Sequence, residues 1–519
     1  MKHERGLSFL AALASGALTA LAFPKFDAAV LAWVSLIPLF FVLSGSRPRQ
    51  AFRYGLVAGL GFYALLLYWV PAVPAHFGDM SVSLSLLVYF ALILFLALFW
   101  ASFGFAFAKF RASFPRGAYL AAPVLWVAFE YAVTYVLTGF PWGLLGHSQY
   151  RNTPFIQLAA WTGVYGLSFV LILLQSTFVL AMTRRVKAPF FSALALLAAI
   201  HAAGALAMRS TVSGGTPFKA SVIQGNTSSD IHWDAIPAEE IMAIFRAHMD
   251  LTRRACDEGA RLVVWPEFTV PLCFSCPGGI YRTFNNELTT FVREKSCTLL
   301  LGTNETSGPP ERELYFNTAL CLHPDGSSSR YAKMHLVPFG EYTPYAKVFF
   351  FIEKVTHSIG DITAGRQHVL HEHAGLRFGS PICYEIIFPD LVRRFADQGA
   401  DFLVTITNDG WYGRTSAPCQ HFAIAVFRAV ENRRFLLRAA TTGVSGIIDP
   451  RGRVLAESPI MITAVLTGDI VPVKERTFYT RHGDVLALAC LTFGLIFFIM
   501  SLFKRSQGMD RHARHRKIF

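Results

Sequence analysis

Pro381-Ile-Cys-Tyr-Glu-Ile386 marks the point where an apolar, strand-like run (375–382) gives way to a helix-like run (388–398). Cys383 therefore falls at a strand-to-helix turn, where the helix N-terminus and any nearby cation favour its thiolate. The thiolate is the form in which cysteine attacks a carbonyl carbon. The alternative is a cysteine that only packs, because cysteine is among the most buried residue types. Cys383 is thus a candidate nucleophile whose role depends on the residues around it.

Two further ionisable side chains lie in apolar runs far upstream of this turn. Glu267 follows Trp265-Pro266 at the end of the run 261–267, and Lys333 lies among the apolar residues of 331–341. A carboxylate at a strand end suits a general base, and an ammonium in apolar surroundings suits an oxyanion. The alternatives are an exposed or helix-capping glutamate and a surface lysine. Taken together, the thiol, carboxylate and ammonium predict a covalent acyl-transfer site.

The composition of the chain predicts a membrane protein. Of its 519 residues, 53% are hydrophobic and 16% are charged, and the mean hydropathy is +0.41. A helix that crosses a bilayer needs about 20 mostly apolar residues. Eight such runs are present: 7–23, 28–44, 52–70, 82–108, 117–137, 155–181, 189–208 and 485–503. The block 212–480 between the last two runs has ordinary globular composition and is long enough to bury its own core.

The basic residues predict the orientation of these spans. The net charge of +13 does not indicate nucleic-acid binding, because Lys and Arg gather at alternate span ends rather than on one soluble face. The clusters are Lys2 and Arg5; Arg47, Arg49 and Arg53; Lys109, Arg111 and Arg116; Arg184, Arg185 and Lys187; and the tail 504–519. Positive charge marks the cytoplasmic side, so both termini are expected there and 212–480 outside. The first span resembles a signal peptide, but six more spans follow it before the block 212–480, and an uncleaved signal-anchor is expected.

Short apolar runs alternate with helix-like stretches in the block 212–480. The expected strands are 220–224, 262–265, 298–302, 314–322, 375–382, 402–407, 436–440 and 444–448. The expected helices are 237–258, 281–295, 388–398 and 419–432, of which the last two are amphipathic. Alternation at this density predicts a layered α/β architecture in which helices cover apolar sheets.

Seven of the eight cysteines fall in this outer block, where oxidation is permitted. Cys273 and Cys276 form either a local disulfide or a pair of reduced thiols. A zinc site is not expected, because no second ligand pair at suitable spacing accompanies them.

Glu130 lies inside the fifth expected span, where a charge is costly unless it is paired or hydrated. It is either a hydrogen-bonded carboxylate that packs in the bundle or one wall of a polar cavity. The loop that follows, 138–149, is rich in glycine and aromatic residues and falls on the outer side. Such a loop suits the roof of a lipid pocket, although aromatic residues are also common at membrane interfaces.

Three motifs resemble the Glu-Lys-Cys site of the nitrilase superfamily. They are Trp265-Pro-Glu267; Tyr331-Ala-Lys333 with His335-Leu-Val-Pro-Phe-Gly-Glu341; and Ile382-Cys-Tyr-Glu385. With eight spans around them, the whole chain resembles the apolipoprotein N-acyltransferase family, which completes bacterial lipoprotein maturation. Further matches are Gln224-Gly-Asn226, Trp233, Tyr315-Phe-Asn317, Thr407-Asn-Asp-Gly-Trp-Tyr-Gly413, Gln420-His-Phe422, 438–443 and Gly139-Phe-Pro-Trp142.

The resemblance implies an αββα sandwich for the outer domain and a ping-pong reaction. Cys383 would attack an acyl ester of a phospholipid, with phosphatidylethanolamine as the expected donor, Glu267 as base and Lys333 as oxyanion stabiliser. The amine of a diacylglyceryl-cysteine at a lipoprotein N-terminus would then take the acyl chain. Positions that support the site in the family are matched by Glu341, Glu385, Tyr384, Trp233 and Asn317.

The chain departs from the family pattern at two places. Some relatives carry an arginine shortly after the intramembrane glutamate, where this chain has 132–134 as Ala-Val-Thr; this leaves the partner of Glu130 open. Phe316 splits the tyrosine-asparagine pair of the family, which leaves the role of Asn317 open.

The run Val348-Phe-Phe-Phe-Ile352 is too apolar for a solvated loop. As a lid, Phe349, Phe350 and Phe351 would give lipid access to the site, and the charges that flank the run suit a membrane interface. The alternative is an ordinary buried helix.

The expected fold class is α + α/β, an eight-helix transmembrane bundle with an inserted nitrilase-like αββα sandwich. The expected domains are 1–210 with seven helices, the catalytic domain 212–480, the eighth helix 485–503 and the basic tail 504–519. We expect a monomer in the bacterial inner membrane with a periplasmic catalytic domain. The expected partners are a phospholipid donor and a diacylated apolipoprotein acceptor, without nucleic acid, cofactor or metal.

Two other functions use the same features differently. A membrane-tethered amidase would use the same three residues with water as the second nucleophile, but one span would be enough to tether it. A transporter or scaffold would need several polar groups inside the bundle, where Glu130 is nearly alone. Eight spans and the apolar run 348–352 favour a lipid substrate instead.

Overall fold

The computed structural model of the 519-residue chain describes residues 2–78, 80–210, 214–228, 236–269, 273–274, 276, 278–309, 312–344 and 362–515. The chain divides into two compact units. The first comprises Met1–Tyr68, Leu86–Arg209 and Asp484–Phe519, and the second comprises Trp69–Ser85 and Ser210–Gly483.

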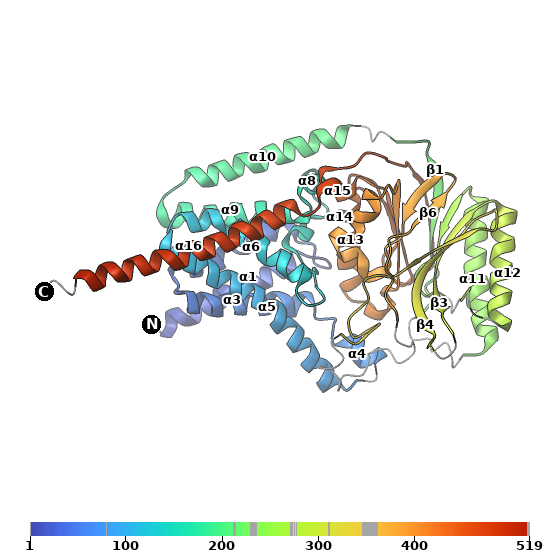
Figure 1. Cartoon of the computed structure of the whole chain (residues 1–519), viewed down its shortest axis with the longest axis horizontal. Coiled ribbons are helices and arrows are strands. Elements are labelled where there is room, and N and C mark those ends of the chain that lie inside the picture. The colour runs from blue at the N-terminus through green and yellow to red at the C-terminus, as the bar shows by residue number, and fades with distance from the viewer. Residues whose placement is uncertain are drawn as a thin grey trace. The chain divides into compact units, whose positions relative to one another are not determined.

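The first unit is a bundle of helices (Figure 1). Its α-helices are α1 Lys2–Leu21, α2 Ile37–Gly45, α3 Pro48–Leu66, α5 Val82–Ser113, α6 Gly117–Tyr135, α7 Thr153–Ile156, α8 Ala159–Thr162, α9 Val164–Arg184, α10 Ala188–Arg209 and α16 Val485–His515, and its 3-10 helices are η1 Ala29–Trp33 and η2 Leu145–Gln149. Glycine allows close approach of these helices, because a Cβ at Gly16 of α1 would strike the Ala58 carbonyl of α3. Small residues at helix contacts are typical of membrane bundles.

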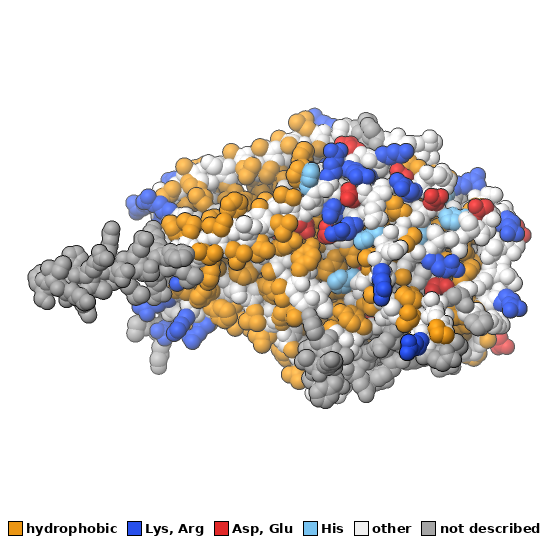
Figure 2. All heavy atoms as spheres, viewed as in Figure 1, with side chains coloured by type: hydrophobic (Ala, Val, Ile, Leu, Met, Phe, Trp, Pro, Cys, Tyr) orange, Lys and Arg blue, Asp and Glu red, His pale blue; other side chains and the backbone are white. Residues whose placement is uncertain are grey.

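Four of these helices, α5, α6, α9 and α10, are long and apolar enough to cross a membrane. Shorter apolar helical stretches cover Arg5–Leu21, Ala29–Gly45 and Val485–Ser501. Large apolar side chains stay exposed on this unit, including Leu10, Phe90 and Leu206. Figure 2 shows hydrophobic side chains spread over the surface of its helices. An apolar surface of this kind is typical of contact with lipid. The count of eight spans stays a prediction.

The second expected span, 28–44, is interrupted. The helical path stops after η1 and restarts at α2, and the Gln175 side chain of α9 satisfies the backbone at the break. Its Oε1 accepts from the Leu36 N–H at 2.7 Å, and its Nε2 donates to the Ala32 carbonyl at 3.1 Å. Broken helices are tolerated at membrane depth where neighbouring helices supply such partners, and composition alone does not reveal them.

The second unit holds two six-stranded sheets, ordered β12-β1-β2-β3-β4-β5 and β11-β10-β9-β8-β7-β6. The strands are β1 Phe218–Gln224, β2 Leu262–Val264, β3 Thr298–Ser307, β4 Leu314–Leu322, β5 Ser328–Ala332, β6 Leu370–His373, β7 Leu376–Gly379, β8 Phe402–Thr407, β9 Leu436–Ala440, β10 Gly446–Ile448, β11 Val454–Glu457 and β12 Ala464–Ile470. Strands β1 to β3 are parallel neighbours, as are β7 to β9. Their carboxyl ends therefore share one edge in each sheet.

Helices cover the outer face of each sheet (Figure 1). The first sheet carries α11 Ala238–Asp257 and α12 Gly279–Lys295, and the second carries α13 Pro389–Asp397 and α14 Ala417–Asn432. The inner faces pack on each other, with the rings of Phe218 and Phe402 5.4 Å apart. The order is helices, sheet, sheet, helices, which confirms the expected nitrilase-like αββα sandwich.

The four expected helices of this unit and the eight expected strands are present; β4, β8 and β9 have the expected ends, and the ends of the others are shifted. The sequence interpretation missed β5, β6, β11 and β12, which are the outermost strands of the two sheets. Edge strands keep one side accessible, and their sequences mix polar and apolar residues, as in Leu370-His-Glu-His373. They therefore lack the continuous apolar runs that reveal central strands.

The segment Trp69–Ser85 belongs to the second unit, although the sequence placed it within the domain 1–210. Its helix α4 Ala72–Phe77 lies against the 3-10 helix η5 Asp409–Tyr412. The rings of Trp69 and Tyr412 lie 4.9 Å apart, and those of Phe77 and Trp411 lie 4.7 Å apart. Aromatic contacts hold this segment beside the end of β8. In the same unit, Cys273 and Cys276 are joined by a disulfide, which answers the alternative left open by the sequence.

Candidate active site

The three predicted catalytic residues lie at strand ends of the second unit. Glu267 stands three residues past β2, Lys333 directly follows β5, and Cys383 begins the 3-10 helix η4 Cys383–Ile387 after β7. Their exposed fractions are 2%, 1% and 5%. Lys333 Nζ lies 3.4 Å from Glu267 Oε1 and 3.0 Å from Glu341 Oε1. Lys333 is therefore a buried, doubly paired ammonium and not a surface lysine.

Asn317 on β4 links the two carboxylates that flank Lys333. Its Nδ2 donates to Glu267 Oε1 at 2.7 Å and to Glu341 Oε1 at 2.9 Å. The neutral amide adds donors without adding charge, so two carboxylates can share a small space. Phe316 separates Tyr315 from Asn317 in the sequence, but Asn317 still contacts both carboxylates of the site.

The second oxygen of Glu267 is also fixed. Oε2 accepts from the Asn408 N–H at 2.8 Å, just past β8. Behind it, a Cβ at Gly302 would lie 2.6 Å from the Glu267 Cα, closer than real contacts allow. Glycine on β3 thus lets the Glu267 backbone pack against the sheet, and the carboxylate orientation is set from both sheets of the sandwich.

Cys383 has a left-handed backbone with φ +50°. A residue with a Cβ adopts this region at a cost, and such turns are common where a side chain must project into a site. The Thr407 Oγ1 lies 3.2 Å from Sγ, and His421 Nε2 lies 3.2 Å from the Cys383 carbonyl oxygen. Burial raises the pKa of the Cys383 thiol, the Glu267 charge raises it further, and Lys333 only partly opposes them. The expected preformed thiolate is therefore not favoured, and the resting group is a thiol.

The charges around Lys333 act in the opposite direction. Burial alone would lower the pKa of Lys333, but the carboxylates of Glu267 and Glu341 raise it above its usual value. Lys333 is therefore a permanent cation, and its charge acts on the Cys383 thiol. A fixed positive charge in a buried site is suited to a developing oxyanion.

Glu385 ties the loop after Lys333 to the turn of Cys383. Its Oε1 accepts from the Tyr331 hydroxyl at 2.8 Å and from the N–H groups of Met334 at 2.6 Å and His335 at 3.0 Å. Its Oε2 accepts from the Ile382 N–H at 2.7 Å. Burial raises the pKa of Glu385 to about 7, while these hydrogen bonds oppose a larger rise.

Tyr384 lies buried next to the thiol-bearing residue. Its ring centroid is 5.7 Å from that of His335 and 5.2 Å from that of Phe388. The predicted residues Trp233, Phe349, Phe350 and Phe351 lie outside the described residues.

A buried charged cluster contacts the Cys383 turn through His421, and the sequence interpretation gave it no role. Arg438 Nη2 donates to Asp409 Oδ2 at 2.7 Å, and His421 Nδ1 lies 3.0 Å from Asp409 Oδ1. Burial would raise the pKa of Asp409, but Arg438 and His421 lower it to about 2. Asp409 is thus an anion under all ordinary conditions.

The signal for these residues was present in the sequence as the runs Thr407-Asn-Asp-Gly-Trp-Tyr-Gly413, Gln420-His-Phe422 and 438–443. These runs supported the family resemblance, but no local pattern assigns their members to a neighbour. Tyr412, in the first of these runs, also reaches the site: burial raises its pKa, and the charge of Asp409 raises it further.

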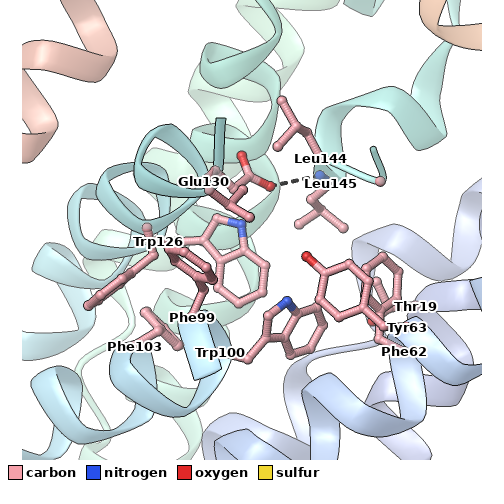
Figure 3. A pocket seen from close by; sticks show the side chains of 13 residues that line it. Thr19, Phe62, Tyr63, Phe99, Trp100, Phe103, Trp126, Glu130, Leu144 and Leu145 are labelled. Carbon is pink, nitrogen blue, oxygen red and sulfur yellow. Dashed lines mark hydrogen bonds between the residues drawn. The ribbon is translucent and has the colours of Figure 1, made fainter. Parts of the chain in front are cut away.

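Glu130 belongs to α6 of the first unit, and Figure 3 shows it at a pocket whose labelled lining includes Tyr63 and Trp126. Its Oε1 accepts from the Leu145 N–H at 2.7 Å, which identifies the partner that the sequence left open. It lines a cavity of about 20 Å³, room for one water-sized group, together with Tyr63, Trp100 and Trp126. The cavity walls are mainly aromatic. Of the two alternatives that the sequence left open, the hydrogen bond to Leu145 favours a carboxylate that is hydrogen-bonded inside the bundle, and it also borders this mainly aromatic cavity.

The described residues hold no group of three His, Cys, Asp or Glu side chains that could bind a metal ion.

Two family models match the chain. Residues 15–177 match the apolipoprotein N-acyltransferase N-terminal domain, and residues 219–478 match the carbon-nitrogen hydrolase family. The apolipoprotein N-acyltransferase of Geobacter metallireducens is 39% identical over 93% of this chain and 93% of its own length. That of Azotobacter vinelandii is 34% identical over 91% of each chain.

Among solved structures, an amidase from Nesterenkonia sp. is 22% identical, covers 53% of this chain and 95% of its own, and has a TM-score of 0.37. Membership does not rest on that structure but on the sequence relatives, which match both units over almost their full length. On that ground, this chain belongs to the apolipoprotein N-acyltransferase family.

Proposed function

We propose that this protein moves a fatty acyl chain from a phospholipid to the N-terminal amine of a diacylglyceryl-cysteine lipoprotein, through a thioester on Cys383. One observation carries the proposal. A buried ammonium, Lys333, is held between the carboxylates of Glu267 and Glu341, beside a cysteine that a left-handed turn projects from the end of β7. Base, cation and nucleophile are the parts that covalent acyl transfer requires.

The first half-reaction takes the acyl chain from the donor, with phosphatidylethanolamine as the proposed phospholipid. Sγ of Cys383 attacks the ester carbonyl carbon as its proton passes to Glu267, and the carbonyl oxygen becomes an oxyanion beside Lys333. The ester C–O bond then breaks, and Glu267 returns the proton to the departing alcohol oxygen. Because the resting group is a thiol, loss of its proton is coupled to attack.

The second half-reaction delivers the acyl chain. The α-amine of the lipoprotein attacks the thioester carbonyl carbon, and Glu267 takes a proton from the nitrogen. The C–S bond breaks as the amide forms, and the Cys383 thiol regains its proton from Glu267. The Glu267 carboxylate thus serves as base and acid in both half-reactions. This role requires a fixed orientation of the carboxylate. The hydrogen bonds from Asn317 and Asn408 support that orientation.

We further propose the membrane arrangement predicted by the sequence. Eight spans with cytoplasmic termini would place the catalytic domain 212–480 in the periplasm, where lipoprotein N-termini and outer-leaflet lipids meet. Four helices of sufficient length and apolarity support this arrangement. A monomer contains every residue named above.

The test uses the full chain purified in detergent. Incubation with phospholipid should add one fatty acyl mass to the peptide that holds Cys383, and hydroxylamine should release it. The variant Cys383→Ala should lose this adduct, whereas Cys321→Ala, which changes another buried cysteine, should keep it. Addition of a diacylated lipopeptide should then yield the triacylated product.

A membrane-tethered amidase is the competing function, because the carbon-nitrogen hydrolase model covers the same residues. It predicts that water, and not the lipopeptide amine, discharges the acyl-enzyme. Release of free fatty acid without acylated lipopeptide would defeat our proposal and support the amidase.

A further inference from the structure

The Thr407 hydroxyl contacts both the candidate nucleophile and a buried anion. Thr407 Oγ1 lies 3.2 Å from Cys383 Sγ and 3.0 Å from Asp409 Oδ1. A threonine hydroxyl carries one proton and accepts through its lone pairs. It can therefore donate to the sulfur or to the carboxylate, but not to both at once.

Asp409 keeps other partners when the hydroxyl turns away from it. Arg438 donates to Oδ2, and His421 Nδ1 lies beside Oδ1. All three side chains are fully buried, so their positions do not depend on solvent. When the Thr407 hydroxyl stops donating to it, the Asp409 carboxylate therefore still has these two partners.

We propose that Thr407 is a further catalytic residue, whose hydroxyl donates to Asp409 while Cys383 is a thiol and rotates to donate to the sulfur as the S–H proton leaves. In the resting state the S–H can donate to Thr407 Oγ1. When Glu267 removes that proton, the Thr407 O–H turns to the sulfur, and the negative charge gains a hydrogen bond. Once the S–C bond to the acyl group forms, the hydroxyl returns to Asp409. This inference rests on the proposed function, since it assigns Cys383 as the nucleophile.

The site gives the anionic sulfur few other donors among the described residues. Hydrogen bonds to charged groups are stronger than neutral ones, so a single hydroxyl has a measurable effect on a buried thiolate. The groups that also influence the Cys383 sulfur are Glu267 after β2, Lys333 after β5, and Asp409 and Tyr412 in η5. His421 in α14 contacts the Cys383 carbonyl oxygen. They remain unchanged when Thr407 alone is altered.

Thr405 offers a matched control on the same strand. It lies two residues before Thr407, so both side chains point to the same side of β8. Both are fully buried, and Thr405 Oγ1 has no hydrogen-bond partner among the residues that the structure describes. Replacement by valine keeps the shape of either side chain and removes only the hydroxyl.

The experiment measures alkylation of Cys383 by iodoacetamide in the full chain across pH, with peptide mass spectrometry to separate Cys383 from the other cysteines. In Thr407→Val, the rate at neutral pH should fall about tenfold and its pH profile should move up by about one pH unit. Thr405→Val and Thr407→Ser should follow the wild type. The first-order rate of acyl-enzyme formation at saturating phospholipid should fall with the alkylation rate.

One result would contradict the proposal. If Cys383 is alkylated at the same rate in Thr407→Val as in Thr405→Val across pH, the Thr407 hydroxyl does not stabilise the thiolate. Should the valine variant fail to fold, Thr407→Ala compared with Thr405→Ala decides in the same way. The alkylation result does not depend on acyl transfer. Failure of the proposed function would appear in a different measurement, as acyl transfer that is retained in Cys383→Ala. That outcome can be recognised whatever the alkylation profile of the Thr407 variants.

Discussion

The side-chain amide of Asn317 donates a 2.7 Å hydrogen bond to Oε1 of Glu267, and its position on β4 gives the base a neutral neighbour. The replacement Asn317→Asp would set a third carboxylate against Glu267 and Glu341. Because like charges in a buried site repel, acyl-enzyme formation should fall about 100-fold at pH 8 and recover partly as the pH is lowered. Rates from intact mass spectrometry across pH check this.

Asn317→Leu is the control for that prediction, since it keeps the volume but adds no charge. It should lower the rate about tenfold without the recovery at lower pH. A wild-type rate in Asn317→Asp would show that the Glu267 orientation does not depend on Asn317.

The two carboxylates that contact Lys333 should differ in function. Glu267→Gln removes the proposed base and should slow acyl-enzyme formation at least 100-fold. Glu341→Gln removes one partner of Lys333 but leaves the base, so a loss of about tenfold is expected. Equal losses in both variants would argue that the carboxylates act only by holding the ammonium.

Acid should destabilise the fold through His371, which is fully buried between the hydroxyls of Ser329 and Ser380. Burial, with a smaller effect of His323, lowers the pKa of His371 from 6.5 to about 3. Its stabilising contribution is complete above pH 6.5 and is lost as the pH falls, because only the unfolded chain then takes up the proton. At pH 5.5 the loss is about 1.4 kcal/mol.

Thermal unfolding of the detergent-solubilised chain at pH 5.5 and 7.5 measures this effect. In His371→Asn the difference between the two pH values should shrink relative to wild type. An unchanged difference would mean that His371 does not remain neutral in the folded protein.

The contact between Trp69 and Tyr412 should matter for catalysis, because η5 also carries Asp409. Trp69→Ala removes the ring that packs 4.9 Å from the Tyr412 ring and should lower the acylation rate several-fold. Trp161→Ala is the control, since 65% of Trp161 is exposed. Steady-state kinetics of lipopeptide acylation compares the two, and equal activity would rule out a positioning role for Trp69–Ser85.

Glu130 should act through its hydrogen bond to the Leu145 backbone. Glu130→Leu leaves that buried N–H without its acceptor and should destabilise the bundle by about 1–3 kcal/mol. Glu130→Gln keeps an oxygen at this position and should be close to wild type in thermal unfolding. If Glu130→Gln unfolds normally but loses acylation, the carboxylate charge itself has a function.

The central strands and the helices of the sandwich were predictable, because each is a continuous or periodic apolar pattern of local sequence. The outer strands were not, since a strand such as Val454–Glu457 is half exposed and has no such pattern. The same limit applied to the break between η1 and α2. The run 28–44 is mainly apolar, with Ser35 at the break and Pro38 at the start of α2 as local signs of it. The partner that satisfies the backbone there, the Gln175 side chain from α9, is visible only in the folded chain.

The sequence by itself determined that a carboxylate follows β2 and a thiol follows β7, and it placed an ammonium in an apolar run, although the strand before it, β5, was missed. Tertiary structure alone decided which groups surround them, because the partners are distant along the chain. Asn408 donates to Glu267 across 141 residues, and Asn317 does so across 50. Local patterns record propensity and burial, whereas a hydrogen bond between strands depends on how two sheets pack face to face. For that reason the cluster of Asp409, His421 and Arg438, and the hydroxyl of Thr407 between sulfur and carboxylate, emerged only from the folded chain.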